Sequence, residues 1–330
     1  MNTNVDVFGI GNALLDTLVF VEDTFLHDHE ITKGTMTLVD NKKQISIINA
    51  LKSSTLTTTS GGSAANTMHG IALCGGSAAF VGKVAADAFG QAYDLDLKDA
   101  GITLESLPGN PEKAPTGSCL VLITPDGERS MLTNLGISAT LSKQDYELND
   151  ILSTKILYIE GYLWDGKIQK EACLEALQFA KKNNVLRSFT FSDPFCVDRS
   201  KDEFRDLCQN HLDIVFCNKD EMMHYTGQPD FDKALELFSQ DVKTAFITHS
   251  DKGAVIIHNN EISHVTGFPT QVKDTTGAGD AFAAGVLYGL TQGFDHKKAV
   301  KIGNFLGSKI VQKEGARLTK EDIEGFDKVS

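Results

Sequence analysis

Short apolar runs alternate with longer amphipathic stretches along most of the chain. The runs hold five to seven residues and are rich in Val, Ile and Phe, as buried strands are. Helical spacing of apolar side chains lies between them, for example at residues 168–183 and 231–239. Strands and helices in alternation predict an α/β fold with right-handed crossovers and a mostly parallel sheet. The strands are expected at residues 5–11, 155–160, 188–192, 213–218 and 244–248.

Polar residues follow many of these expected strands. Because ligands collect at the carboxyl ends of strands in such sheets, polar strand ends on one edge predict a binding edge. The polar ends are Asn12, Asp16, Glu160, Asp193, Asn218 and Thr248.

Two stretches depart from the alternation. Residues 31–39 and 118–133 are typical of extended structure, and the second contains Asp126-Gly127, a strong hairpin-turn signal. Such strands predict a small accessory sheet beside the main layer. Since no internal repeat or flexible linker is visible, the 330 residues are expected to form one large domain.

Composition narrows the class of protein. Hydrophobic residues make up 41% of the chain, which supports a substantial core, yet no run of eighteen apolar residues exists to cross a membrane. The first residues lack the basic and apolar regions of a signal peptide, and the six cysteines show no paired spacing, so reduced thiols in a cytoplasm are expected. A net charge of −13 argues against nucleic acid or an anionic membrane as partner and leaves small molecules.

The segment 274–282, Asp-Thr-Thr-Gly-Ala-Gly-Asp-Ala-Phe, is the strongest candidate for chemistry. Its two glycines form a turn that leads into an apolar helix at residues 281–290, and the start of a helix offers N–H groups and a positive dipole end to phosphate. Asp280 lies in that first turn, close enough to accept a proton from a hydroxyl that attacks phosphate. An ordinary tight turn is the alternative. A dinucleotide fingerprint is excluded, because Phe282 stands where its third glycine should fall.

A second glycine turn lies about two hundred residues upstream. The segment 61–66, Gly-Gly-Ser-Ala-Ala-Asn, follows a strand-like run at residues 55–60 and precedes a small-residue helix at residues 69–75. Its glycines allow close backbone approach to a ligand, and Asn66 offers both a donor and an acceptor. Alone, this pattern indicates a helix start capped by Ser63. Together, the two motifs resemble the two signatures of the ribokinase-like (PfkB) family of carbohydrate and nucleoside kinases in order and separation.

Further blocks extend the resemblance over most of the chain. Blocks similar to those of adenosine kinases within that family lie at residues 11–16, 115–119, 133–136 and 158–163. The resemblance implies a ribokinase-like three-layer α/β/α domain over residues 1–330. It also implies a small β-sheet lid, formed by insertions at roughly 14–45 and 115–135, that closes over the substrate.

For the acceptor, the resemblance implies a sugar site and a base site. Asp16 would accept hydrogen bonds from two vicinal ribose hydroxyls, which suits a carboxylate; the alternative is a solvated turn residue. Met36 departs from the polar residue at that place in animal adenosine kinases, so the mode of base recognition stays open. The sugar site would be completed by Asn12, Gly61, Gly62 and Asn66. Apolar walls for a purine, each alternatively plain core, would come from Leu14, Met36, Leu38, Leu135, Tyr162 and Leu163.

For the nucleotide, the resemblance implies contacts from several segments. Asn218 and Glu221 are similar to the family's Asn-x-x-Glu motif, in which Glu221, expected near solvent, would orient water around Mg²⁺; an ordinary helix N-terminus is the alternative. Arg129 in the lid hairpin would reach the transferring phosphate on closure, or is a surface charge. The anion hole beside the Asp280 base would consist of the N–H groups of Gly277, Ala278 and Gly279. ATP contacts would come from Asn218, Thr248, Gly253, Gly277, Gly279 and Asn304.

The expected activity is ATP- and Mg²⁺-dependent transfer of the γ-phosphate to the 5′-hydroxyl of adenosine, giving AMP for purine salvage. A monovalent cation such as K⁺ is a further expected cofactor. Two alternatives stay open. One is a sugar kinase of the same family that acts on ribose, fructose or a similar sugar, and the other is a nucleoside- or sugar-binding regulator without turnover. The chain is expected to act as a monomer, with a dimer as the alternative.

Overall fold

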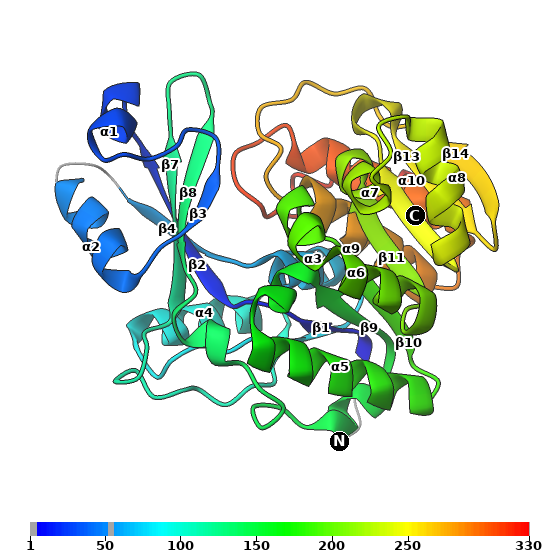
Figure 1. Ribbon diagram of the computed structural model, residues 1–330, viewed down its shortest axis with the longest axis horizontal. Coiled ribbons are helices and arrows are strands. Elements are labelled where there is room, and N and C mark those ends of the chain that lie inside the picture. The colour runs from blue at the N-terminus through cyan, green and yellow to red at the C-terminus, as the bar shows by residue number, and fades with distance from the viewer. Residues whose placement is uncertain (1–4, 52–55, 330) are drawn as a thin grey trace.

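The computed structural model describes residues 5–51 and 56–329, which fold around a nine-stranded sheet (Figure 1). The strands are β1 Val5–Ile10, β5 Ala78–Val81, β6 Thr103–Leu104, β9 Thr154–Glu160, β10 Leu186–Thr190, β11 Ile214–Asn218, β12 Thr244–Thr248, β13 Ala254–His258 and β14 Glu261–Val265. They run in the order β14-β13-β12-β11-β10-β9-β1-β5-β6. The pairs from β12 through β6 are parallel, whereas β12–β13 and β13–β14 are antiparallel. The predicted mostly parallel sheet is confirmed.

Helices cover both faces of this sheet (Figure 1). One face carries α5 Lys167–Lys182, α6 Pro194–Asn210, α7 Lys219–Thr226 and α8 Phe231–Asp241. The other carries α3 Ser63–Leu73, α4 Ala88–Asp99, α9 Ala278–Thr291 and α10 His296–Ile310. Successive residues of β9 alternate between the two hydrophobic cores, Leu157 and Ile159 in one, Ile156 and Tyr158 in the other. The predicted three-layer α/β/α arrangement is confirmed.

Helices α9 and α10 approach each other unusually closely. A Cβ atom placed on Gly285 of α9 would lie 2.7 Å from the Cα of Gly303 on α10. Glycine at both positions lets the two backbones meet, which holds the middle of α9 against the middle of α10. Asp280 and Asn304, two predicted site residues, are carried by these helices.

A second, smaller sheet stands beside the main layer as the lid (Figure 1). Its strands are β2 Leu14–Phe20, β3 Met36–Leu38, β4 Thr57–Gly61, β7 Gly117–Ile123 and β8 Arg129–Asn134, in the order β3-β8-β7-β2-β4. Two helices, α1 Asp23–Asp28 and α2 Asn41–Ala50, cover its outer face over an apolar cluster that includes Val19, Ile47 and Leu122. The sheet therefore has one face buried under helices and one face free to meet the main domain.

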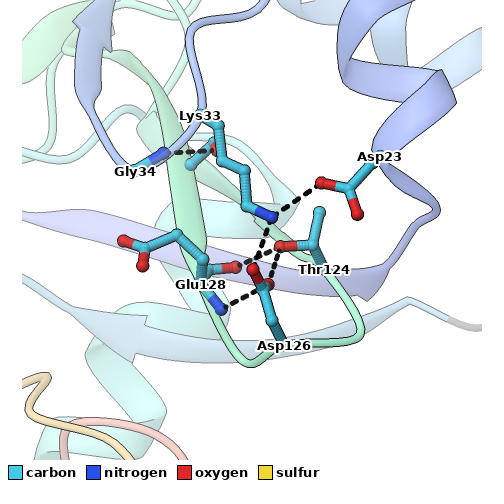
Figure 2. Close-up of polar contacts among 7 residues, drawn as sticks. Asp23, Lys33, Gly34, Thr124, Asp126 and Glu128 are labelled. Carbon is cyan, nitrogen blue, oxygen red and sulfur yellow. Dashed lines mark hydrogen bonds and ion pairs between the residues drawn. The ribbon is translucent and has the colours of Figure 1, made fainter.

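The tip of the lid is tied by a charged network. Lys33 donates to Asp23 of α1 and to Asp126 of the β7–β8 turn, each at 2.6 Å, and Figure 2 shows this ammonium between the two carboxyls. Thr124 donates to the same Asp126 at 2.7 Å. Gly127 has a φ of +83°, as the predicted hairpin turn requires. These bonds join three segments of the lid, so its tip moves as one unit.

Three local predictions need correction. The helix expected at residues 69–75 begins earlier, at Ser63, and its N-cap is Gly62, so Ser63 is not the cap. Within the extended stretch 31–39, only Met36–Leu38 forms a strand. The strand-like run at 55–60 becomes β4 and pairs with the lid, outside the predicted lid boundaries, while Thr55 itself lies outside the described residues.

No helix in the described part of the chain is both long and apolar enough to span a membrane. All six cysteines are buried and none forms a disulfide. Burial raises the pKa of the Cys74 and Cys119 thiols to about 12, so both stay protonated near neutral pH. The short 3₁₀ helices are η1 Gly136–Thr140, η2 Leu148–Ser153, η3 Gly161–Asp165, η4 Ser250–Lys252 and η5 Phe326–Lys328.

Candidate active site

Glu160, the last residue of β9, anchors the edge of the sheet where the parallel strands end. Its carboxyl is 1% exposed and accepts from the backbone N–H of Asn12 at 2.7 Å, from the Asn12 amide at 3.0 Å and from the N–H of Ala64 at 2.8 Å. A Cβ atom on Gly11 would lie 2.5 Å from this carboxyl, so the chain needs glycine there. Glu160 therefore fixes the end of β1 against the start of α3.

The environment of Glu160 is unusual for an acid. Burial raises the pKa of its carboxyl to about 7, while hydrogen bonds from Asn12 and Ala64 act in the opposite direction. The sequence marked Glu160 only as one polar strand end among several. Its partners are 148 and 96 residues away, so no local pattern announces the role.

Every polar atom of the Asn12 side chain forms a hydrogen bond with another residue of the protein. Its amide donates to Glu160, and its carbonyl oxygen accepts from Ser138 and Gln169, both at 2.9 Å. The side chain is buried. Asn12 thus shapes the site from behind, and its predicted contact with the sugar stays a prediction.

Asp280 joins the two glycine motifs. It occupies the first turn of α9, where Ser63 donates to one carboxyl oxygen at 2.6 Å and Asn66 to the other at 3.3 Å. Burial raises the pKa of Asp280 to about 6, against Ser63, Asn66 and the charge of Arg317, which lower it. A carboxyl with this pKa is largely ionised at neutral pH and a stronger base than an ordinary aspartate, as general-base catalysis favours.

The turn before α9, residues 274–279, is held by backbone conformation and by Asp274. Gly277 has a φ of +74° and is the N-cap; its added Cβ would lie 2.8 Å from the Cα of Ala316. Around Gly279 there is open space, because an added Cβ meets nothing within 4 Å. The amide of Ala278 donates to the Thr275 carbonyl at 3.1 Å, so this member of the predicted anion hole already has an acceptor.

Asp16 lies inside lid strand β2 and is half-buried, so the solvated-turn alternative does not describe it. A Cβ atom on Gly61 would lie 2.3 Å from its carboxyl. Burial raises the pKa of Asp16 to about 7; the charges of Arg317 and Arg129 lower it, and that of Asp280 raises it. The charge of the candidate base therefore acts on the carboxyl of Asp16, which lies on the lid sheet.

Strand register defines the rest of the lid face that carries Asp16. Asp16 pairs with Cys119, and Cys119 with Thr133; two residues further along each strand, Leu18 pairs with Val121. Since residues two apart in a strand share a face, these side chains lie on the Asp16 face. The same register adds Met36 and Met131. The same face also carries Leu14, two residues before Asp16, and Leu38, which pairs with Thr133. The sequence had therefore indicated Leu14, Met36 and Leu38 of this apolar set; the missed members are Leu18, Cys119, Val121 and Met131.

The predicted wall residues besides Met36 lie in two kinds of place, on the lid and in the main core. Leu14 and Leu135 meet at the base of the lid, where an added Cβ on Gly117 would contact both residues. Leu38 is on the lid but exposed, and Tyr162 packs against the main core with its hydroxyl 3.5 Å from the Ser192 carbonyl. The list of wall residues therefore stays a prediction, except that Leu163 is fully buried in the main core, as its plain-core alternative states.

The predicted ATP loops meet around residues 265–267. Gly253 has a φ of +90°, and an added Cβ would lie 2.2 Å from the Val265 carbonyl. Asn304 donates to the carbonyls of Val265 and Thr266 at 3.2 and 3.1 Å. Thr248 pairs with Ala254 at the end of β12, next to this turn. Thr248 and Gly253 from one segment and Asn304 from α10 therefore converge on one loop.

Asn218 and Glu221 form a capping box at the start of α7. The Glu221 carboxyl accepts from the Asn218 backbone at 2.9 Å and from its amide at 2.7 Å, while the Asn218 side chain accepts from the Glu221 N–H at 2.8 Å. Glu221 is only 5% exposed, so its expected place near solvent is wrong. The box folds the side chain back over the helix start, which satisfies N–H groups that would otherwise lack partners.

Acids gather near Glu221. Burial, together with the charges of Asp193, Asp220 and Asp280, raises the pKa of Glu221 to about 7, against a hydrogen bond from Asn218. Oxygen donors that repel one another suit a hard cation such as Mg²⁺. Within the described residues, no group of three His, Cys, Asp or Glu side chains could hold a metal by itself. The donor set therefore fits Mg²⁺ only if phosphates and waters supply most of the ligands.

Arg129 joins the lid to the glycine turn before α9. It forms an ion pair with Asp274 at 2.5 Å, in which the two side chains are 11% and 7% exposed. Asp274 also accepts from the Thr276 N–H at 3.0 Å and the Gly315 N–H at 2.9 Å. Arg129 is therefore not a surface charge, and its predicted contact with the transferring phosphate stays a prediction.

The family model and the relatives named below are all described as kinases. A family model described as pfkB family carbohydrate kinase matches residues 34–323. A probable sugar kinase protein from Rhizobium etli CFN 42 is 38% identical, with a TM-score of 0.91 and coverage of 99% of this chain and 98% of that chain. The adenosine kinase from Sinorhizobium meliloti is 36% identical, with a TM-score of 0.91 and coverage of 99% and 100%. A curated 5-dehydro-2-deoxygluconokinase from Bacillus anthracis is 28% identical over 285 residues, 81% of this chain and 85% of its own.

Proposed function

Because the chain belongs to the pfkB family of carbohydrate kinases, we propose that it transfers the γ-phosphate of ATP to the 5′-hydroxyl of adenosine, giving AMP and ADP. Family membership makes it a phosphotransferase with a hydroxyl acceptor. The choice of adenosine goes further and is supported by one observation. Asp16, which is suited to a sugar diol, lies on a lid face that is otherwise mostly apolar.

This arrangement separates the tasks of the acceptor site. Asp16 would bind the ribose hydroxyls, and the apolar side chains on its face would bury the flat faces of the purine. A free sugar is small and polar on all sides, so it would leave these apolar side chains without a partner. A nucleoside therefore gains hydrophobic free energy that ribose or fructose does not.

Asp280 would act as the general base on the 5′-hydroxyl. Its carboxyl is oriented by Ser63 and Asn66, and burial keeps its pKa near 6, so it can hold the proton released as the oxygen attacks phosphorus. The glycine turn before α9 and the helix dipole would stabilise the charge on the transferring phosphate. Mg²⁺, oriented through water near Glu221, would neutralise phosphate charge when bound. A lid in contact with the glycine turn before α9 would exclude water and limit ATP hydrolysis.

A panel of acceptors tests the proposal. The purified protein is assayed with ATP and Mg²⁺ on adenosine, inosine, ribose, fructose and 5-dehydro-2-deoxygluconate, in KCl and in choline chloride. We expect kcat/KM for adenosine to exceed that for ribose by roughly a thousandfold, since the buried purine faces contribute several kcal/mol. Asp16→Asn should lower kcat/KM for adenosine by about 10- to 100-fold, the worth of a hydrogen bond to a charged group, with KM for ATP little changed.

A sugar kinase is the second candidate, favoured by two of the relatives named above. Efficient phosphorylation of a sugar with adenosine inert would establish it. The family assignment and the role of Asp280 would survive that result, because both candidates phosphorylate a hydroxyl.

A further inference from the structure

Arg317, in the segment after α10, enters the acceptor site from the far end of the sequence. Its Nε donates to the Asn66 Oδ1 at 3.0 Å, and its Nη1 forms an ion pair with Asp96 of α4. The side chain is 15% exposed, and Nη2 is enclosed without a hydrogen-bond partner among the described residues. Enclosing a guanidinium with one nitrogen unsatisfied is unfavourable, so its presence calls for a reason beyond packing.

The contact with Asn66 sets the direction of the Asn66 amide. A guanidinium has only donors, so the Asn66 oxygen must face Arg317. The NH₂ group of Asn66 then points the other way, where it donates to the Asp280 carboxyl at 3.3 Å. Were the amide reversed, two donors would meet at Arg317 and two acceptors at Asp280. The chain Arg317–Asn66–Asp280 therefore has one satisfied arrangement, and it favours the ionised carboxylate.

We propose that Arg317 is the positioning residue of the catalytic base, because it fixes the Asn66 amide so that Asp280 is held ionised and oriented. This inference rests on the proposed function, in which Asp280 is the base. It adds a residue that acts through Asn66, without contact with the reacting atoms.

The charges around Asp280 agree with this role. On the opposing elements, Asp16, Glu160 and Glu221 each have a pKa that the charge of Asp280 raises, so the site holds several acids in mutual repulsion. Arg317 is the cation whose charge lowers the pKa of Asp280, and it also lowers that of Asp16. Burial and the charge of Arg317 together lower the pKa of His69 to about 4, so this histidine stays neutral. The other charges that face this cluster are Arg129 on β8, Asp96 on α4 and Lys313.

A purely structural role is the competing explanation. Arg317 ties the segment after α10 to α4 through Asp96, and loss of that tie alone would lower stability. Arg187 is a matched control for it. Arg187 is 13% exposed and pairs with Asp213 at 2.5 Å, but at the amino ends of β10 and β11, on the edge of the sheet away from the site.

The experiment compares Arg317→Gln with Arg187→Gln in the full-length protein. The carboxyl of Asp280 is titrated by ¹³C NMR after selective aspartate labelling, with its signal assigned from Asp280→Asn, and kcat is measured from pH 5 to 9. We expect Arg317→Gln to raise the Asp280 midpoint by about one pH unit, because removal of a cation and its relay destabilises the carboxylate. The acid limb of kcat should move with it, so the loss is about tenfold at pH 5.5 and small at pH 8.5. Arg187→Gln should lower the melting temperature and leave both midpoints in place.

An Asp280 midpoint in Arg317→Gln equal to the wild type would overturn the inference and leave the proposed function intact. Failure of the wild type to phosphorylate any acceptor would instead remove the proposed function, a result that the NMR titration does not depend on. Should Arg317→Gln not fold, Arg317→Lys decides. A single ammonium cannot hold Asn66 and Asp96 together, so we expect a rise of about half a pH unit. An unchanged midpoint in Arg317→Lys would equally overturn the inference.

Discussion

The proposed acceptor side and the proposed nucleotide side of the site are built by different means. On the acceptor side, Asp16, Glu160 and Asp280 are carboxyls with raised pKa values. Hydrogen bonds from side chains or N–H groups place Glu160 and Asp280. On the nucleotide side, Gly253 and Gly277 adopt positive φ, and their backbones lie against neighbouring backbone. Gly62, with a φ of +96°, is the exception on the acceptor side. The proposed acceptor chemistry otherwise depends on which side chain is present, whereas the shape of the proposed nucleotide side depends on where the backbone runs.

The largest expected effect is on the acceptor side. Asp280→Asn keeps the volume and removes the base, so kcat should fall by about 10²–10⁴, the usual worth of a positioned base. The dissociation constant for ATP, measured by calorimetry, should stay within a few fold, because the nucleotide loops are untouched. Turnover near the wild-type rate would end the assignment of the base.

On the nucleotide side, a pair of glycine substitutions tests the role of the backbone. Gly277→Ala places a Cβ 2.8 Å from the Ala316 Cα at a φ of +74°, which should cost about 1–3 kcal/mol of unfolding free energy and weaken ATP binding. Gly279→Ala is the matched control, since its Cβ meets nothing within 4 Å. Urea unfolding of both variants gives the comparison. Equal stability of the two would show that the turn is not fixed by backbone contact.

Substitution of Glu221 tests whether a side chain also contributes to the function of the nucleotide side. Glu221→Gln retains a side-chain oxygen for the capping box and loses the negative charge, so stability should change by about 1 kcal/mol or less. The Mg²⁺ concentration for half-maximal rate should rise several fold if this acid orients water around the ion. A Mg²⁺ titration that overlays the wild type would leave Glu221 as a helix cap alone.

The smallest effect concerns stability and pH. Asp16, Glu160 and Asp280 have folded pKa values of about 6 to 7, above their ordinary values of 3.8 and 4.5. The folded protein therefore keeps protons that the unfolded chain has already released, and the stability contributed by these groups, complete below about pH 4, falls as pH rises to about 7. The melting temperature should be a few degrees higher at pH 5 than at pH 8. Asp280→Asn cannot ionise, so its decline should be shallower; an identical decline would mean that other groups cause it.

Strand and helix alternation was enough to predict five neighbouring parallel strands of the main sheet, because each βα unit buries its apolar residues locally. The expected strands did not include β5, β6, β13 and β14 at the two ends of the sheet. Lid strand β2, Leu14–Phe20, was harder to recognise. Its outer residue Val19 packs under the lid helices, while Leu18 on the opposite face packs with Val121. With apolar side chains on both faces, the strand loses the alternation that marks a one-sided sheet.

The site residues also divide into those that the sequence could predict and those that it could not. Asp280 and the glycines were predictable, since a turn, a helix start and an acid are adjacent in the sequence. The role of Arg317, the hydrogen bonds of Glu160 and the pairing of Arg129 with Asp274 were not, because each depends on partners on other elements, up to 251 residues away in the case of Arg317 and Asn66. A local pattern has no access to such partners.

The ion pair between Arg129 and Asp274 couples the position of the lid to the position of the glycine turn before α9. One partner belongs to the lid and the other to the turn that would receive phosphate, so displacement of either changes the freedom of both. Coupled equilibria are reciprocal. If nucleotide binding shifts the equilibrium of lid closure by some factor, lid closure shifts the affinity for nucleotide by the same factor. Because both side chains are almost enclosed, this coupling should respond weakly to ionic strength, unlike one carried by the exposed charges at the lid tip.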